Sequence, residues 1–309
     1  MRLKPFARYA WGVLTVNVLV ILWGAYVRAT GSGAGCGSHW PTCNGAIIPR
    51  APQIETLIEF THRLSSGLAL LLVVGLLIWA WRGFGKGHPV RLGGILAMVF
   101  IITEALVGAA LVLFEWVAKD ESLGRVIFIA IHLVNTFLLL ASLTLTAWWA
   151  SGGHKLRLKS QGVLRWAFGV GFLGVIFLGI SGAITALGDT LFPVATLNEG
   201  LLQDISSTAH FTIRLRVWHL VIAILVGFYL TFLALWQFSS RKEPAIRRLS
   251  ILLGSMFFFQ LTAGLVNLLL LAPVAMQLIH LFLADMVWVM LVLLFAATFQ
   301  EESQLSTVE

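Results

Sequence analysis

The sequence predicts an all-α polytopic membrane protein, and its composition and the length of its apolar runs support this fold class. The chain has 309 residues, of which 59% are hydrophobic and only 11% are charged, and its mean hydropathy is +0.91. A soluble domain does not combine so much apolar surface with so little charge. Runs of about 20 apolar residues, the length that crosses a bilayer, occur eight times. The expected spans are 7–27, 56–81, 91–114, 124–149, 163–187, 211–238, 248–271 and 274–299.

The first apolar run is expected to remain in the protein as a membrane span. It has a basic start, as a signal peptide does, but it lacks a cleavage site of small residues. We therefore interpret it as a retained helix.

The basic residues predict the orientation of the chain. The net charge is +7, which by itself suggests a nucleic-acid partner, but the basic residues gather in alternate loops and indicate a membrane orientation instead. Fourteen lysines and arginines fall on one side and seven on the other. The positive-inside rule then places both termini in the cytoplasm. We expect a multi-pass protein of the plasma membrane. The fourteen are Arg2, Lys4, Arg8, Arg82, Lys86, Arg91, Lys155, Arg157, Lys159, Arg165, Arg241, Lys242, Arg247 and Arg248.

The chain contains an internal repeat that predicts two halves. The triplet around His132 recurs around His280, and His62 in the second span corresponds to His219 in the sixth. A Glu104-x-x-x-Gly motif in the third span recurs as Gln-x-x-x-Gly in the seventh. Both halves start from the same side, so they are parallel repeats. We predict two pseudo-symmetric four-helix bundles, with an N-terminal domain over 1–150 and a C-terminal domain over 151–309.

The loop after the first span, about 28–55, is predicted to form a compact cap outside the membrane. Five glycines and three prolines there disfavour regular structure. Cys36 and Cys43 lie close together in this loop and suggest a disulfide if the compartment is oxidising, although two free thiols are the alternative. A counterpart at about 188–207 has no cysteine, so the halves are not equivalent.

Four histidines are expected at a similar depth in the membrane. His62, His132, His219 and His280 lie six to eight residues inside the outer ends of their spans, which places them roughly 9–12 Å below the surface. Bundles build cofactor sites from facing helices in this way. Two histidines without a cysteine or carboxylate cluster suit bis-histidine haem ligation better than zinc or copper. The alternative is that each histidine makes a polar contact between helices.

Several glycines lie near these histidines in the sequence. They could let helix backbones approach one another or leave room for a flat macrocycle. They are Gly67, Gly108, Gly182, Gly227 and Gly264.

The two halves differ three residues before the first histidine of each pair. Glu59 stands there in the first half, and a carboxylate beside a haem can move protons or hold a water. Arg216 stands there in the second half, and a guanidinium suits haem propionates. Arg28, Arg63 and Arg214 are further candidates for propionate contacts, with interfacial snorkelling as the alternative. The first half is therefore expected to perform chemistry and the second to relay electrons.

Other polar residues are candidates for supporting roles. Asn135 and Asp285 follow two of the histidines and could orient their imidazoles from outside the set of iron ligands. Glu104 lies near mid-bilayer, as a proton-path residue or as a neutral acid bonded to a neighbouring helix. His39 and His210 could contact an edge of a ligand.

Three segments of the first half resemble the haem A synthase family. They are Thr30-Gly31-Ser32-Gly33-Ala34-Gly35-Cys36-Gly37, then Trp40-Pro41-x-Cys43-x-Gly45, and Glu59-x-x-His62-Arg63. The resemblance covers essentially the whole chain. The second-half motif departs from it, because Leu220 stands where an arginine follows the histidine in many members. Many bacterial relatives also carry a second cysteine pair that this chain lacks.

The resemblance implies an oxidoreductase that converts a methyl group of haem O to a formyl group, giving haem A for terminal oxidases. It implies substrate haem between His62 and His132 and a haem b cofactor between His219 and His280. Glu59 matches the essential acid of the family. A haem O synthase and an electron donor are the implied partners, in a lipid environment and without nucleic acid.

Two other functions use the same histidines. A di-haem protein that passes electrons to quinone needs the four histidines but has no use for Glu59 or the cap. A haem or small-molecule transporter is favoured only by the parallel repeat.

Overall fold

The computed structural model describes residues 4–158 and 162–301, and its regular secondary structure within these ranges is helical. Arg2 and Lys159, two of the residues in the basic loops, lie outside the described residues. Eight helical spans are long and apolar enough to cross a membrane, which confirms the predicted all-α polytopic fold. The spans are α1 (Pro5–Ala29), α2 (Ile54–Gly83), α3 (Pro89–Leu113), α4 (Leu123–Ala150), α5 (Gly162–Leu191), α7 (Phe211–Arg214) with α8 (Arg216–Ser240), α9 (Pro244–Leu269) and α10 (Val274–Phe299).

The helix bounds agree with the predicted spans to within four residues, and the largest differences are at the end of α5 and at the start of α9. Helix α5 continues to Leu191, and the short helix α6 (Leu197–Ile205) occupies much of the segment expected to be a loop. Thr196 caps α6, because its hydroxyl accepts a hydrogen bond from the Glu199 backbone N–H at 3.2 Å. A single 3₁₀ turn, η1 (Ser32–Ala34), lies in the first outer loop.

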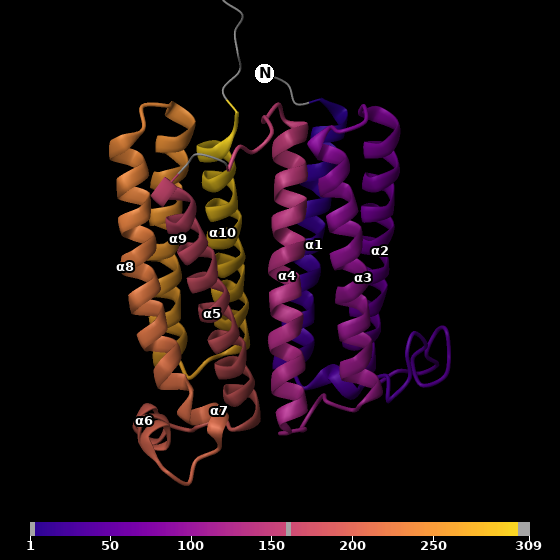
Figure 1. Ribbon diagram of the computed structural model, residues 1–309. Coiled ribbons are helices and arrows are strands. Elements are labelled where there is room, and N and C mark those ends of the chain that lie inside the picture. Colours follow the sequence, from indigo (N-terminus) through magenta and orange to yellow (C-terminus); the bar gives the residue numbers. More distant parts are fainter. Residues whose placement is uncertain (1–3, 159–161, 302–309) are drawn as a thin grey trace, which may run out of the picture.

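The long helices form two groups that lie side by side (Figure 1). Helices α1–α4 form one group, and α5, α8, α9 and α10 form the other. Helices α4 and α10 pack at the boundary between them and are the two most buried spans. Phe137 of α4 stacks on Trp288 of α10 with ring centres 4.7 Å apart, and the Trp288 indole donates to the Phe137 carbonyl at 2.7 Å. This buried contact satisfies the only polar group of the indole.

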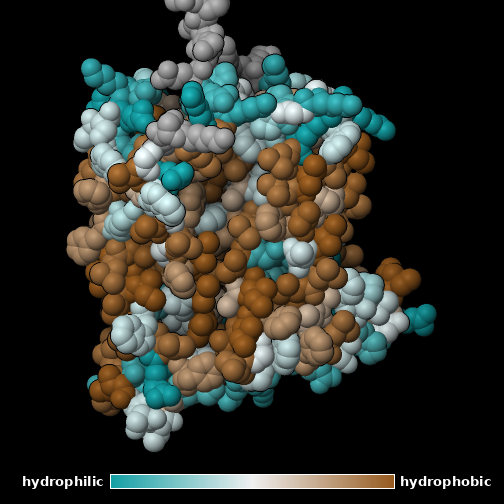
Figure 2. Space-filling view, viewed as in Figure 1, coloured by the Kyte–Doolittle hydropathy of each residue, from teal (hydrophilic) through white to brown (hydrophobic). Residues whose placement is uncertain are grey.

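The two outer segments lie at one end of the molecule. The loop after α1 and the helices α6 and α7 are at the lower end in Figure 1, whereas α1 begins and α10 ends at the upper end. Hydrophobic side chains cover most of the face between these ends, with hydrophilic side chains concentrated along the upper rim (Figure 2). This distribution fits helices that cross a lipid bilayer.

Candidate functional site

Each of the four histidines lies against a glycine on the neighbouring helix of its own group. His62 of α2 faces Gly24 of α1, where an added Cβ would lie 2.9 Å from the ring carbon Cε1. His219 of α8 faces Gly182 of α5 in the same way, at 3.0 Å. Carbon atoms in contact normally lie about 3.5–4.0 Å apart, so these glycines leave space that a methyl group would take from the imidazole.

The second histidine of each half repeats the arrangement. An added Cβ on Gly264 of α9 would lie 2.8 Å from Cε1 of His280, and one on Gly108 of α3 would lie 3.8 Å from Nε2 of His132. Of the glycines named from the sequence, Gly108, Gly182 and Gly264 lie against a histidine ring.

Two other glycines named from the sequence do not face a histidine, and one glycine that does was not named. Nothing lies within 4 Å of a Cβ at Gly67, and Gly227 faces Phe257. Gly24 was missed, although it stands in the first half where Gly182 stands in the second. The alignment of the two halves was the signal that could have found it.

The second-half pair has the spacing of two imidazoles that share one metal ion. The ring centres of His219 and His280 lie 6.5 Å apart and the rings are perpendicular. Two imidazoles bound to one metal through bonds of about 2 Å have ring centres a little over about 6 Å apart. Within 4–158 and 162–301 no group of three or more His, Cys, Asp or Glu side chains could hold a metal ion. Two imidazoles at this spacing fit a group such as haem, which brings its own equatorial nitrogens.

His132 has a carboxylate partner that the sequence did not assign to it. Oε1 of Glu104 lies 3.1 Å from Nδ1 of His132, and Glu104 also accepts hydrogen bonds from Thr136 and Asn135. Asn135 in turn accepts a bond from Thr103 at 2.6 Å. Asn135 therefore reaches the imidazole only through Glu104.

In the second half the corresponding contacts are neutral. The Ser181 hydroxyl lies 2.9 Å from Nδ1 of His219, and the Gln260 side-chain nitrogen lies 3.3 Å from Nε2 of His280. The repeat of Glu104-x-x-x-Gly108 as Gln260-x-x-x-Gly264 was the sequence signal for Glu104 and Gln260. Asp285 is fully buried, but neither of its oxygens has a hydrogen-bond partner in the described chain, so the expected contact with an imidazole is absent there.

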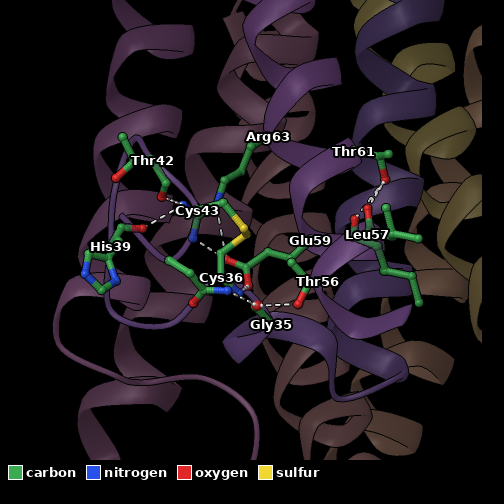
Figure 3. The surroundings of a disulfide bond; sticks show 12 residues. Gly35, Cys36, His39, Thr42, Cys43, Thr56, Leu57, Glu59, Thr61 and Arg63 are labelled. Carbon is green, nitrogen blue, oxygen red and sulfur yellow. Dashed lines mark hydrogen bonds and ion pairs between the residues drawn. A yellow bond between two sulfur atoms is a disulfide. The ribbon is translucent and has the colours of Figure 1, made fainter. Parts of the chain in front are cut away.

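Glu59 joins α2 to the outer loop, as Figure 3 shows. Its Oε2 accepts a hydrogen bond of 2.7 Å from the Cys36 backbone N–H, and its Oε1 is paired with Arg63. Arg63 also donates to the carbonyls of His39 and Thr42, each at 2.6 Å. The side chain of Arg63, four residues after Glu59, is thus committed to the loop.

The outer loop is held against the start of α2. Cys36 and Cys43 form a disulfide bond, which confirms the predicted pairing. The Thr56 hydroxyl donates to the Gly35 carbonyl at 2.7 Å. Gly35 lies so close to α2 that an added Cβ would be 2.4 Å from the Glu55 carbonyl oxygen. We call residues 30–53 the disulfide cap.

Arg216, expected as a contact for a haem propionate, is paired with two carboxylates of the protein. Its guanidinium lies 3.4 Å from Asp189 of α5 and 3.3 Å from Asp204 of α6. It therefore ties α6 to the bundle, as Glu59 ties the disulfide cap. Burial raises the pKa of the Asp204 carboxyl and the charge of Arg216 opposes that shift.

The remaining arginine candidates divide between the interior and the surface. Arg28 donates to the Ala186 carbonyl at 2.7 Å, to the Thr190 hydroxyl at 2.8 Å and to the Gln277 side chain at 2.9 Å, so it links α1 to the other helix group. Arg214 is exposed.

The two loop histidines lie in the outer segments. The carbonyl of His39 is bound by Arg63, and the ring of His210 lies 2.8 Å from the Thr212 hydroxyl.

The fold and the site together define an α-helical multi-pass membrane protein with two helix groups, each carrying a pair of glycine-backed histidines. The chain belongs to the COX15-CtaA family of cytochrome oxidase assembly proteins, which it matches over residues 7–292.

Three similar proteins carry two different names. A protoheme IX farnesyltransferase of Thermus thermophilus is 57% identical over 288 residues, which are 93% of this chain and 47% of that relative. A heme A synthase of Exiguobacterium sp. is 28% identical over 266 residues, covering 84% of this chain and 82% of the relative. A heme A synthase of Lysinibacillus sphaericus is 48% identical over 97 residues, or 31% of this chain and 32% of the relative. The chain thus spans about half the length of the Thermus protein.

Proposed function

We propose that this chain is a haem A synthase, an oxidoreductase that converts a methyl group of haem O to the formyl group of haem A. The observation that carries the proposal is the set of four histidines, each placed on a glycine of the adjacent helix, with one pair in each half. The similarity to proteins named heme A synthase supports the choice of reaction.

The halves have separate roles in this proposal. Residues 1–150 hold the substrate haem between His62 and His132, and residues 151–309 hold a haem b between His219 and His280. Haem iron, when bound, supplies the electron-transfer and oxygen chemistry. Bis-imidazole spacing in the second half supports the assignment of haem b.

The chain's own residues provide positioning and proton chemistry. Glu59 lies one turn before His62 on α2, so the two side chains share a face of the helix. We assign to its carboxylate oxygens the holding or moving of a proton during oxidation of the methyl group. Its bonds to Cys36 N–H and Arg63 fix its position under the disulfide cap.

The arginines are the candidates for propionate contacts. Arg28, Arg63 and Arg216 already have protein partners, so a propionate would join existing networks. Arg214 is exposed and has the fewest constraints.

The placement in the cell follows the charge distribution and the disulfide. We propose a plasma-membrane protein with cytoplasmic termini and the disulfide cap outside, where a disulfide persists. A farnesyl transfer to protohaem is the class of reaction that supplies a farnesylated haem such as haem O. The Thermus relative, named for that transfer and about twice as long as the matched segment, supports a haem O synthase as partner.

The test is extraction of pigments from protein purified after expression with and without a source of haem O. Chromatography should detect haem A only with haem O, and Glu59→Ala should abolish it. Glu59→Gln removes the acid but retains an oxygen that can accept the hydrogen bond from Cys36 N–H. Loss of haem A in Glu59→Gln as well as in Glu59→Ala would therefore assign the effect to proton chemistry and not to anchoring of the cap. A folded, pigmented wild-type protein that yields only haem B with haem O present would refute the proposal and favour the di-haem electron-transfer alternative.

A further inference from the structure

A groove of about 200 Å³ lies between α8 and α9, toward the end where the two helices are joined. Each helix lines it with residues three or four positions apart, which share one face of a helix. Seven positions along a helix span about 10 Å, so the groove has room for part of an extended hydrocarbon chain. The lining residues are Thr231, Ala234, Leu235 and Phe238 of α8, and Ser250, Ile251 and Gly254 of α9.

Small side chains open this groove, and the corresponding positions of the first half carry large ones. When the halves are aligned on their repeated motifs, Ala234 stands where the first half has Leu77, and Gly254 stands where it has Met98. A Cβ added to Gly254 would have nothing within 4 Å. In the first half, Leu77 lies 3.4 Å from a Cβ added to Gly94 of the facing helix. The difference in side-chain size therefore singles out the second half.

The wall of the groove is mostly apolar and continuous with the outer surface of the helix group. Leu235 and Ile251, which line it, are both exposed. Ser250 also lines it, and the Ser250 hydroxyl is buried without a hydrogen-bond partner in the described part of the chain. Since an unpartnered buried hydroxyl is unfavourable, an oxygen of a bound molecule would stabilise this position.

Arg247 lies at the mouth of the groove. It is three residues before Ser250, so the two side chains share a face of α9. Its guanidinium lies 4.2 Å from the ring centre of Phe238, and stacking of this kind leaves the N–H donors at the guanidinium edge free. The corresponding Arg91 of the first half stacks on Trp81 and also donates to the Trp81 carbonyl. Within the described residues the Arg247 side chain has no such hydrogen bond, so its donors are available to a ligand.

The segment that joins α8 to α9 is strongly basic. Four positive charges, Arg241, Lys242, Arg247 and Arg248, accompany the single acid Glu243. This segment lies at the upper end of the molecule in Figure 1, where hydrophilic side chains form the rim seen in Figure 2. An apolar groove that ends at these charges is complementary to a molecule with a hydrocarbon chain and an anionic head.

We propose that the groove binds an anionic phospholipid of the surrounding membrane, with an acyl chain between α8 and α9 and its phosphate on Arg247 and the adjacent basic residues. Basic pockets between membrane helices on the cytoplasmic side bind anionic headgroups in this way, and anionic lipids are concentrated in that leaflet. The proposed orientation places this end of the helices on that side. The inference does not depend on the proposed haem chemistry.

The experiment uses full-length protein purified in an uncharged detergent. It is titrated with phosphatidylglycerol, which is anionic, or with phosphatidylcholine that has the same acyl chains and no net charge. Native mass spectrometry counts the retained lipids and gives their dissociation constants, and thermal melts measure the stabilisation. Wild type should retain one phosphatidylglycerol more tightly than phosphatidylcholine, and phosphatidylglycerol should raise the melting temperature further, because it binds the folded protein more tightly.

Two kinds of variant test the head and the chain separately. Arg247→Gln/Arg248→Gln should weaken binding of phosphatidylglycerol about 30-fold, since each basic residue near a membrane surface contributes about 1 kcal/mol. Both side chains are exposed, so this double variant leaves the core intact. Arg82→Gln/Lys86→Gln removes the same charge from the corresponding segment of the first half and should leave binding unchanged. Gly254→Met introduces the first-half residue into the groove, and displacing two methylenes of the acyl chain should already weaken binding about tenfold.

Several outcomes would overturn the inference. Equal affinity of wild type for the two lipids, or equal losses in the two charge variants, would show that the basic segment next to the groove does not recognise the headgroup. Unchanged retention of phosphatidylglycerol in folded Gly254→Met would place the lipid elsewhere. A quinone that displaces phosphatidylglycerol from wild type and binds more tightly would assign the groove to a redox carrier instead.

Discussion

Replacing Gly264 by alanine should disturb the haem site while leaving the fold nearly unchanged. The new Cβ would lie 2.8 Å from Cε1 of His280. Since carbon contacts are normally about 3.5–4.0 Å, the imidazole must move by roughly 0.7–1.2 Å. Ligand constellations tolerate about 0.5 Å, so we expect haem retention in the second half to fall at least about tenfold, which is about 1.4 kcal/mol.

The effect on folding should be small because two contributions oppose each other. Overpacking costs about 1–3 kcal/mol, and the imidazole, at the end of a rotatable side chain, can relieve part of that cost by turning. Alanine in place of glycine inside a helix contributes about 0.5–1 kcal/mol of stability. Haem content, measured per folded protein, should therefore fall much more than the melting temperature.

Two matched variants make this test specific. Gly254 lies on the same helix with nothing within 4 Å of its added Cβ, so Gly254→Ala should retain haem. Gly108→Ala should also be tolerated, because its Cβ would lie at an ordinary 3.8 Å from His132. Full haem content and an unchanged low-spin spectrum in Gly264→Ala would refute the placement of His280 against this glycine.

Three further predictions concern stability. Asp285→Asn should be at least as stable as wild type in thermal melts. The reason is that it removes an ionisable group that is buried without a hydrogen-bond partner in the described chain. A loss of several kcal/mol would instead indicate a partner such as a bound water. Burial, and to a lesser extent Lys155, lower the pKa of His88, whose neutral ring caps α3. Its contribution to stability should be complete above the ordinary histidine pKa of about 6.5 and fall as the pH decreases below it. His88→Asn should flatten that part of the melting-temperature profile, and an unchanged profile would contradict the assignment. The double variant Cys36→Ser/Cys43→Ser should destabilise the disulfide cap by about 2–3 kcal/mol, detected as faster proteolysis within the cap, and equal cleavage rates would argue against this.

The membrane spans could be predicted from the sequence because they depend on local properties. A helix in lipid satisfies its own backbone groups, so the length and hydropathy of each run are sufficient to locate it. Length and hydropathy did not predict the short helix α6 between α5 and α7, because that segment has no long apolar run. A nine-residue helix depends on its Thr196 cap and on its tie to Arg216, and that ion pair is a contact between separate elements.

The candidate histidines were also found from the sequence, since ionisable side chains at membrane depth are rare and their spacing repeats. The residues that contact their rings were not found in this way. Asp285 was expected to orient an imidazole because it is five residues from His280, yet both of its oxygens lack a hydrogen-bond partner in the part of the chain that the structure describes. Glu104, 28 positions before His132 in the chain, is the residue that lies against its ring.

The sequence by itself determined an all-α membrane protein with two halves, four matched histidines and a cysteine-bearing outer loop. Only the tertiary structure decided that Gly24 supports His62, that Ser181 contacts His219, and that Glu59 and Arg63 hold the disulfide cap. The physical reason is that hydropathy fixes where a helix begins and ends, whereas the rotation of one helix against the next decides which side chains meet. That rotation is set by packing between helices, which no single stretch of sequence contains.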